Sequence, residues 1–294
     1  MQQAGNTAGW DRRRLQQALD ELARHSLVER DEQGRFHITA LGRLAGESAV
    51  EVETLLRAIA CLRALRAEEV TDPALIAIAQ TSVELDAIYL PVNRISKHKE
   101  PQHWMGQLRA QGLSETVLAN LQRNITAPGQ DTVRAKKAVA CLYYVSGMGM
   151  EEIERAMSQF GGAFDGVSGP IRSVTSRTCD VLPMIARAAQ LLHAGVDLEQ
   201  RVARLLFRLD LGIQGPVVDL ARYAERTLDR ADYRRLCDAR MTEREALAGA
   251  EDRALLPLLG NDARKIIALR SAVERWRSAR PPAAPAAALP AYQQ

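Results

Sequence analysis

The chain of 294 residues has few aromatic residues, few cysteines and no long apolar run, and each shortage excludes a class of protein. Aromatic residues make up 4% of the sequence, too few for a protein that binds nucleic acid mainly by stacking bases on a sheet. No apolar run reaches the roughly 18–20 residues that span a bilayer, and the N-terminus does not resemble a secretory signal. We therefore expect a cytoplasmic protein with no membrane partner.

Metal and disulfide frameworks are also missing from the sequence. The cysteines lie dozens of residues apart, without a C-x-x-C pair, at Cys61, Cys141, Cys179 and Cys237. This spacing argues against a zinc site and against a secreted disulfide framework, so we expect reduced and mainly buried thiols. His98 and His103 are close in sequence, but only Glu100 lies near them as a further ligand, and we expect no metal site.

The sequence contains none of the motifs of an ATP-driven motor or of a common hydrolase. It has no G-x-x-x-x-G-K-[S/T] run, no acidic box after a hydrophobic strand, and no alternation of strands and helices that could form a nucleotide-binding sheet. A G-x-S-x-G elbow and an H-E-x-x-H helix are missing as well. We expect no catalytic residues and no cofactor in this chain, and no ATP hydrolysis by the chain alone.

What remains is typical of a folded, mainly α protein. Hydrophobic residues make up 47% and charged residues 26%, and the net charge of +3 allows nucleic-acid binding without requiring it. Apolar residues at helical spacing predict helices at 52–66, 72–80, 101–111, 114–123, 131–146, 150–158, 169–193 and 197–211. After a Gly-Pro break, shorter helices are predicted at 216–226, 230–239, 242–249 and 252–277.

One β-hairpin interrupts the helical pattern near the N-terminus. Two short strands at 27–30 and 35–38 flank a glycine-containing turn. Asp11 can cap a helix before them, and Thr39 can cap a second helix after them. Helix, hairpin and helix form the back half of a winged helix. The front half needs two more helices, and the roughly ten residues before Asp11 are too few to form them. One hypothesis is that the chain begins inside a larger protein; the other is a self-contained regulator with a shortened winged helix.

These patterns predict three folded parts and a tail. Residues 1–46 form the C-terminal part of a winged helix, and residues 47–211 form a multi-helix bundle. Residues 212–277 form a small C-terminal helical domain, while the Pro/Ala-rich residues 278–294 are predicted to be disordered.

Three stretches follow one another in an informative order: ALDELARHSLVERDEQGRFHITALGRLA, VEVETLLRAIACLRALRAEEVTDPALIAIAQTSVELDAIYLP and RAKKAVACLYYVSGMGMEEIERAMSQFGGAFDGVSGPIRSVTSRTCDVLPMIARAAQLL. The first contains a T-x-x-G helix start at Thr39 to Gly42. Together they resemble the C-terminal region of superfamily 2 DNA helicases of the Ski-like, HelQ-type branch. The resemblance covers most of residues 14–277 through order and spacing, and it implies a winged-helix end, a helical ratchet domain and a degenerate helix-hairpin-helix.

In that family, an arginine of the ratchet helix holds the backbone of the emerging single strand, and a tryptophan two turns later stacks on a base. The resemblance places Arg172 at the arginine position and Cys179 at the position of the tryptophan, whose loss removes stacking worth about 1–3 kcal/mol. Seven residues at 100° each point both side chains within about 20° of one another. A buried stripe is expected on the other side of the helix, at Ile171, Val174, Thr178, Val181, Ile185 and Leu192. Alternatively, Arg172 and Arg177 are merely solvated.

The end of the chain resembles the family's helix-hairpin-helix, whose hairpin binds phosphates through backbone N–H groups. The first hairpin position, Arg226–Arg230, has no glycine and carries Asp229, which repels phosphate. The second hairpin keeps the expected register at Gly260, Ala263, Lys265 and Ile266, so Gly260 and Lys265 are candidate phosphate contacts. The alternative is a helical packing element.

Two basic clusters are further candidates for tracking a nucleic-acid backbone. The first is a loop next to Trp104, with Arg94, Lys97, His98 and Lys99. The second opens a helix, with Arg134, Lys136 and Lys137. Either cluster could instead be a solvated face.

The resemblance therefore implies an accessory region of an ATP-dependent DNA helicase. The few candidate Arg and Lys contacts predict weak, salt-sensitive binding to single-stranded or forked DNA, without sequence preference. Its motor domains, with their ATP and magnesium, would come from an upstream segment or a separate chain. The alternatives are a free-standing winged-helix DNA-binding regulator and an all-helical interaction scaffold.

Overall fold

The computed structural model describes residues 12–92, 99–160, 168–224 and 226–279. In these residues the chain is mainly helical, with one two-stranded antiparallel sheet, which confirms the predicted fold class at this level. The chain divides into two compact units, Met1–Gly212 and Ile213–Gln294. No helix among the described residues is long and apolar enough to cross a membrane. Most of the tail predicted to be disordered lies outside the described residues.

The first unit begins with the predicted helix, hairpin and helix. Helix α1 (Arg12–Arg24) packs against β1 (Val28–Arg30), which pairs with β2 (Phe36–Ile38), and α2 (Ala40–Glu47) follows. Thr39 caps α2, because its hydroxyl accepts a hydrogen bond from the Gly42 N–H at 3.0 Å. A Cβ atom on Gly42 would lie 2.0 Å from the Leu27 carbonyl oxygen, so only glycine fits there. The T-x-x-G pattern therefore has a local packing cause.

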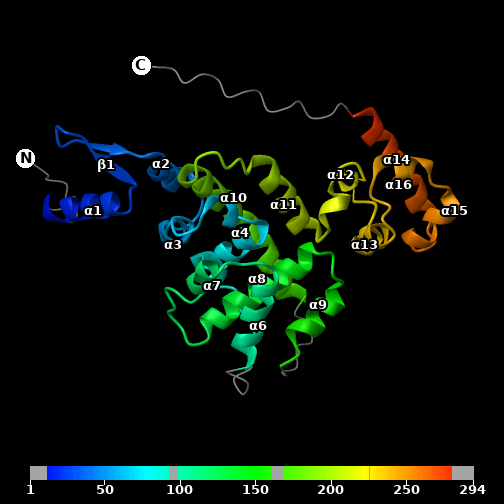
Figure 1. The fold of residues 1–294 in the computed structure, drawn as a ribbon, viewed down its shortest axis with the longest axis horizontal. Helices are drawn as coiled ribbons and strands as arrows, with labels where there is room; N and C mark the ends of the chain where they lie inside the picture. The colour runs from blue at the N-terminus through cyan, green and yellow to red at the C-terminus, as the bar shows by residue number, and fades with distance from the viewer. Residues whose placement is uncertain (1–11, 93–98, 161–167, 225, 280–294) are drawn as a thin grey trace, which may run out of the picture. The chain divides into compact units, whose positions relative to one another are not determined.

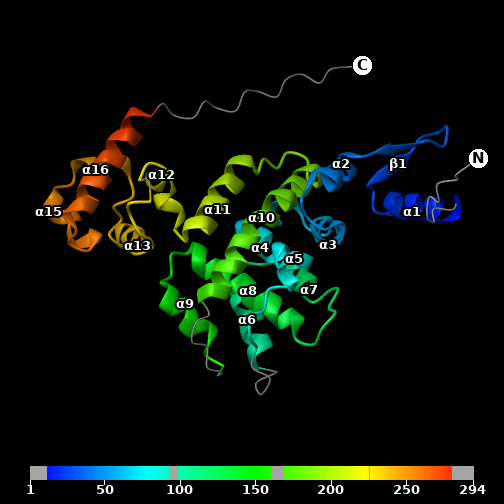
Figure 2. The same ribbon diagram turned by 180° about the vertical axis from the view of Figure 1, so that it is seen from behind.

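The rest of the first unit is a bundle around one long helix, α10 (Ser168–Leu192), as Figures 1 and 2 show. Its 25 residues pack against helices from the whole length of this unit, among them α2, α8 and α11. The other helices of the bundle are α3 (Val52–Leu62), α4 (Asp72–Ala79), α5 (Val83–Asp86), α6 (Lys99–Ala110), α7 (Glu115–Leu121), α8 (Gln130–Val145), α9 (Met150–Met157) and α11 (Glu199–Leu211).

Helix α10 buries the face that its sequence pattern predicts. Five of the six stripe residues are fully buried, and only Leu192, in the last turn, is half-buried. The buried polar member of the stripe, Thr178, accepts a hydrogen bond from the Gln80 side chain at 3.0 Å. The opposite face, which carries Arg172, Ser176 and Pro183, is exposed. The helix thus presents one continuous solvent-facing stripe.

The second unit contains only short helices and one longer helix, α16 (Ala263–Ser278). The prediction of a single helix over 252–277 is wrong, because Gly260 and Asn261 adopt positive φ angles of 67° and 60° and break the chain there. Pro257 precedes this break. Within the same unit, the rings of Tyr223 and Trp276 stack on each other. The remaining helices are α12 (Val218–Ala221), α13 (Arg230–Asp238), α14 (Arg244–Gly249) and α15 (Asp252–Leu255).

Candidate nucleic-acid interface

Arg172 lies in the second turn of α10, on its exposed face. Among the described residues, no carboxylate lies within ion-pairing distance of its guanidinium. The first N–H group of α10, that of Ser168, donates to the Glu154 carboxylate at 2.7 Å, so Arg172 itself supplies the positive charge here. Arg172 therefore keeps its charge available for an external anion, as the sequence pattern predicts.

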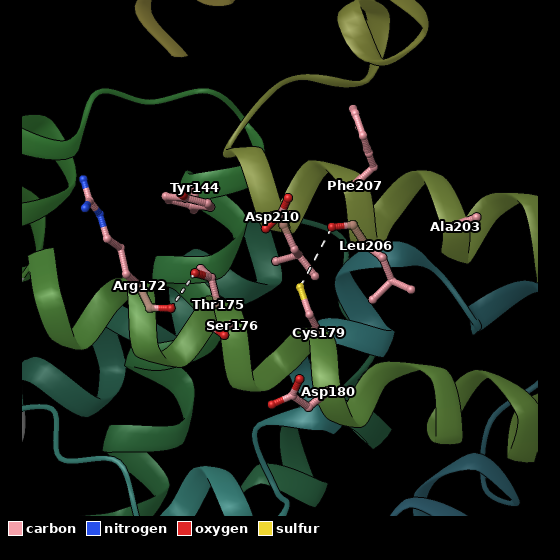
Figure 3. A pocket seen from close by; sticks show the side chains of 11 residues that line it. Tyr144, Arg172, Thr175, Ser176, Cys179, Asp180, Ala203, Leu206, Phe207 and Asp210 are labelled. Carbon is pink, nitrogen blue, oxygen red and sulfur yellow. Dashed lines mark hydrogen bonds between the residues drawn. The ribbon is translucent and has the colours of Figure 1, made fainter. Parts of the chain in front are cut away.

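A groove between α10 and α11 opens beside Arg172 (Figure 3). Its volume is about 880 Å³. The half-exposed Phe207, on α11, is an aromatic side chain in this groove that the sequence pattern did not single out. The groove is lined by Tyr144, Arg172, Thr175, Ser176, Cys179, Asp180, Ala203, Leu206, Phe207, Leu209 and Asp210.

The groove lining carries charges of both signs. Arg172 is its one cationic side chain, and Asp180 and Asp210 are its carboxylates. Asp180 pairs with Arg177 at 3.1 Å, so part of its negative charge is compensated from the neighbouring helix face. An anion would therefore be attracted to the Arg172 end of the groove rather than to its whole length.

Cys179, at the position expected for a stacking side chain, lies in the wall of the groove. Its side chain is half-buried, and its sulfur is 3.9 Å from the Leu206 carbonyl oxygen on α11. Burial raises the pKa of this thiol to about 12, so it is neutral at physiological pH. Arg172 and Cys179 share a helix face as predicted, but α11 covers the second position.

The three basic residues of α8 do not form a nucleic-acid contact, which corrects the prediction. The residues Arg134, Lys136 and Lys137 have relative exposures of 0%, 1% and 1%. The sequence shows a basic run at a helix start, a feature usually found on a solvated face. Here α8 lies at the centre of the bundle, packed against α4, α6 and α10, and its charges face inward.

Each buried cation of α8 has a specific partner. Arg134 forms an ion pair with Asp86 and also donates to the carbonyls of Leu121 and Arg123. Lys136 pairs with the fully buried Glu100 at 2.9 Å and lies 5.5 Å from the centre of the Trp104 ring. These pairings make the cluster part of the core.

The positive charge of Lys137 is less well compensated than the charges of its neighbours on α8. Its ammonium donates to the Leu85 carbonyl, and burial lowers the pKa of the lysine to about 8. The Asp86 carboxylate opposes this shift, whereas the charge of Arg134 adds to it. Lys137 is thus a buried lysine that titrates close to physiological pH.

The loop cluster is only partly visible. Arg94, Lys97 and His98 lie outside the described residues, and Lys99 is the exposed first residue of α6. Trp104 is fully buried, so it does not offer a face to a base. No group of three potential metal ligands occurs among the described residues.

The C-terminal hairpin does not present a phosphate site, which corrects the assignment of Gly260 and Lys265. The Lys265 ammonium lies 2.6 Å from the carboxylates of both Asp229 and Asp232. The bond to Asp229, followed by that to Asp232, raises the pKa of Lys265. The residues that resemble a helix-hairpin-helix thus form an internal charge cluster in this chain.

The backbone N–H groups of this hairpin already form hydrogen bonds within the chain. Gly260 has the expected left-handed conformation, but its N–H and that of Asn261 donate to carbonyls of the preceding turn. At the N-terminus of α16, the Asp262 carboxylate accepts the Arg264 N–H at 2.8 Å. A protein carboxylate therefore already lies where a phosphate would bind.

The comparisons with known proteins add no family to this description. No model of a known protein family matches the sequence, and no curated protein matches it significantly.

Proposed function

We propose that this chain is a nucleic-acid-binding accessory region of an ATP-dependent DNA helicase, which guides a single strand leaving the motor. The exposed Arg172 guanidinium, without an ion-pair partner among the described residues, carries the proposal. The motor domains, with their ATP and magnesium, come from an upstream segment or a separate chain. Single-stranded or forked DNA is the ligand.

The position of Arg172 suits a phosphodiester better than a base edge. A guanidinium binds phosphate oxygens through two parallel hydrogen bonds. The half-exposed Phe207 of the adjoining groove can contact a base or sugar, although α11 covers the expected stacking position at Cys179. Contacts of this kind favour binding without sequence preference.

The direct test measures binding of the full chain to fluorescein-labelled oligo(dT) of about 20 nucleotides. Fluorescence anisotropy reports the affinity at salt concentrations between about 50 and 200 mM. We expect weak binding whose log affinity falls linearly with log salt, by about 0.7 per phosphate contacted. A forked duplex should bind comparably. Lack of binding at the lowest salt contradicts the proposal, and a strong preference for one duplex sequence supports the regulator instead.

A further inference from the structure

A second pocket lies at the other end of α10, where this helix meets β2 and α2. Its volume is about 400 Å³. Two arginines line it, Arg43 from α2 and Arg187 from α10. Its other lining residues are Ile38, Ala40, Leu44, Glu47 and Leu191.

Both arginines of this pocket are exposed, and neither forms an ion pair or side-chain hydrogen bond with a described residue. Elsewhere in the same unit, Arg177 pairs with Asp180 and Arg208 pairs with Asp72. Two like charges that line one pocket repel each other, and an anion between them relieves this repulsion.

Glu47 is the carboxylate that lines the pocket, and it is not within 4 Å of either guanidinium. The three charged side chains give the lining a formal charge of +1. Ile38, which is 63% exposed, and the exposed Leu191 add an apolar wall. The lining therefore combines anion-binding groups with an apolar surface, which suits a phosphodiester and its attached sugar.

Arg187 and Arg172 lie on the same helix, α10, with Pro183 between them, and ideal helical geometry relates their positions. They are fifteen residues apart, which corresponds to about 22 Å along the axis and about 60° around it. Ser176 and Pro183 lie between them on the exposed side. Asp180 also lies there, paired with Arg177. An extended strand can follow this side of the helix from one arginine to the other.

We propose that the pocket lined by Arg43 and Arg187 binds a second phosphodiester of the strand that Arg172 contacts, a proposal that rests on the proposed function. It joins the end of the winged-helix part to the long helix in one binding path. Arginine suits this role because its planar guanidinium binds phosphate bidentately.

The test uses the full chain with Arg43→Gln, Arg187→Gln and Glu47→Gln, with labelled oligo(dT) as the probe. Each arginine variant should weaken binding about three- to tenfold. It should also reduce the log–log salt slope by about 0.7, the value of one phosphate contact. Glu47→Gln should tighten binding, because it removes the negative charge from the pocket. Arg123→Gln is the matched control, since Arg123 is an exposed arginine elsewhere in the unit, and it should leave affinity unchanged.

A parallel titration with inorganic pyrophosphate separates the two proposals. If wild type binds DNA and Arg172→Ala weakens it, while the pocket variants match wild type, the pocket proposal fails and the proposed function stands. If the chain binds pyrophosphate through Arg43 and Arg187 but binds no DNA, the proposed function and the shared strand fail, and a free-phosphate site remains. Binding of neither probe overturns both proposals.

Discussion

The Arg134 guanidinium and the Asp86 carboxylate form a bidentate ion pair inside the helical bundle, with nitrogen–oxygen distances of 2.8 and 2.6 Å. Asp86 also accepts a bond from Arg57 at 3.0 Å. Burial raises the pKa of Asp86, but the bonds and charge of Arg134, together with bonds from Gln130 and Arg57, outweigh this effect and hold it below its ordinary value. The pair therefore favours the charged form of Asp86.

Removal of one partner from this pair should be costly. We expect Arg134→Ala to lower the free energy of unfolding by about 3–5 kcal/mol, because Asp86 loses its main partner and the Leu121 and Arg123 carbonyls lose a donor. Urea unfolding measures the change. Arg123→Ala, at an exposed side chain, should stay within about 0.5 kcal/mol. Equal stability of both variants would show that the pair is not buried in solution.

Lys137 should make stability depend on alkaline pH. Its folded pKa of about 8 lies below its ordinary value of 10.5, so burial of the charged form destabilises the fold at neutral pH. This penalty is fully present below about pH 8 and disappears as pH rises toward the unfolded value. Lys137→Met should therefore raise the free energy of unfolding at pH 7 by about 2–3 kcal/mol.

The difference between wild type and Lys137→Met, measured by urea unfolding, should shrink from pH 7 to pH 10. The Leu85 carbonyl keeps a donor in the variant, because it also accepts the Ile88 N–H. Lys99→Met, at an exposed lysine, should show no such trend. A constant difference across this range would contradict the buried charge.

The contrast between α8 and α10 shows what could be predicted from the sequence. Apolar spacing locates both helices to within one or two residues, and it identifies the buried stripe of α10. The burial of Lys136 could not be predicted in this way, because its partner Glu100 lies 36 residues away in a different helix. The T-x-x-G pattern at Thr39 to Gly42 was visible, but its cause, the approach of the Leu27 carbonyl, is a tertiary contact.

The same limit applies to the candidate site. Helical geometry correctly puts Arg172 on the exposed face, whereas the covering of Cys179 by α11 depends on a helix that starts twenty residues later. The pocket of Arg43 and Arg187 joins residues 144 positions apart, which no local pattern relates. Local spacing predicts which face is exposed, and tertiary packing decides what lies against it.

Cys179→Trp should destabilise the fold rather than restore stacking. The larger side chain must displace α11 near Leu206, and overpacking of this kind typically costs about 1–3 kcal/mol. Thermal unfolding and oligo(dT) anisotropy should show a less stable protein with no gain in affinity. Cys179→Ala is the control and should lower stability by less. Tighter DNA binding by a fully stable Cys179→Trp would show that the groove accepts a stacking side chain.

Lys265→Ala should affect the C-terminal unit and not DNA binding. The fully buried Asp232 would lose one of its two cationic partners and keep Arg235 at 2.6 Å, so we expect a loss of about 1–2 kcal/mol. Hydrogen exchange in α13 and α16 reports this loss. Arg264→Ala, at the exposed neighbouring residue, should change neither exchange nor affinity. A selective drop in DNA affinity for Lys265→Ala would restore the hairpin as a phosphate site.

The central claim, that Arg172 contacts the backbone of a single strand, is tested most directly by the salt dependence of oligo(dT) binding in Arg172→Ala and Arg177→Ala. Arg177 lies about 140° around α10 from Arg172 and pairs with Asp180, which makes it the matched control. We predict that Arg172→Ala lowers affinity and reduces the log–log salt slope by about 0.7, the value of one phosphate contact, with unfolding free energy within about 0.5 kcal/mol of wild type. Arg177→Ala should have the smaller effect. An Arg172→Ala protein that binds DNA with wild-type affinity and wild-type salt slope would contradict the account.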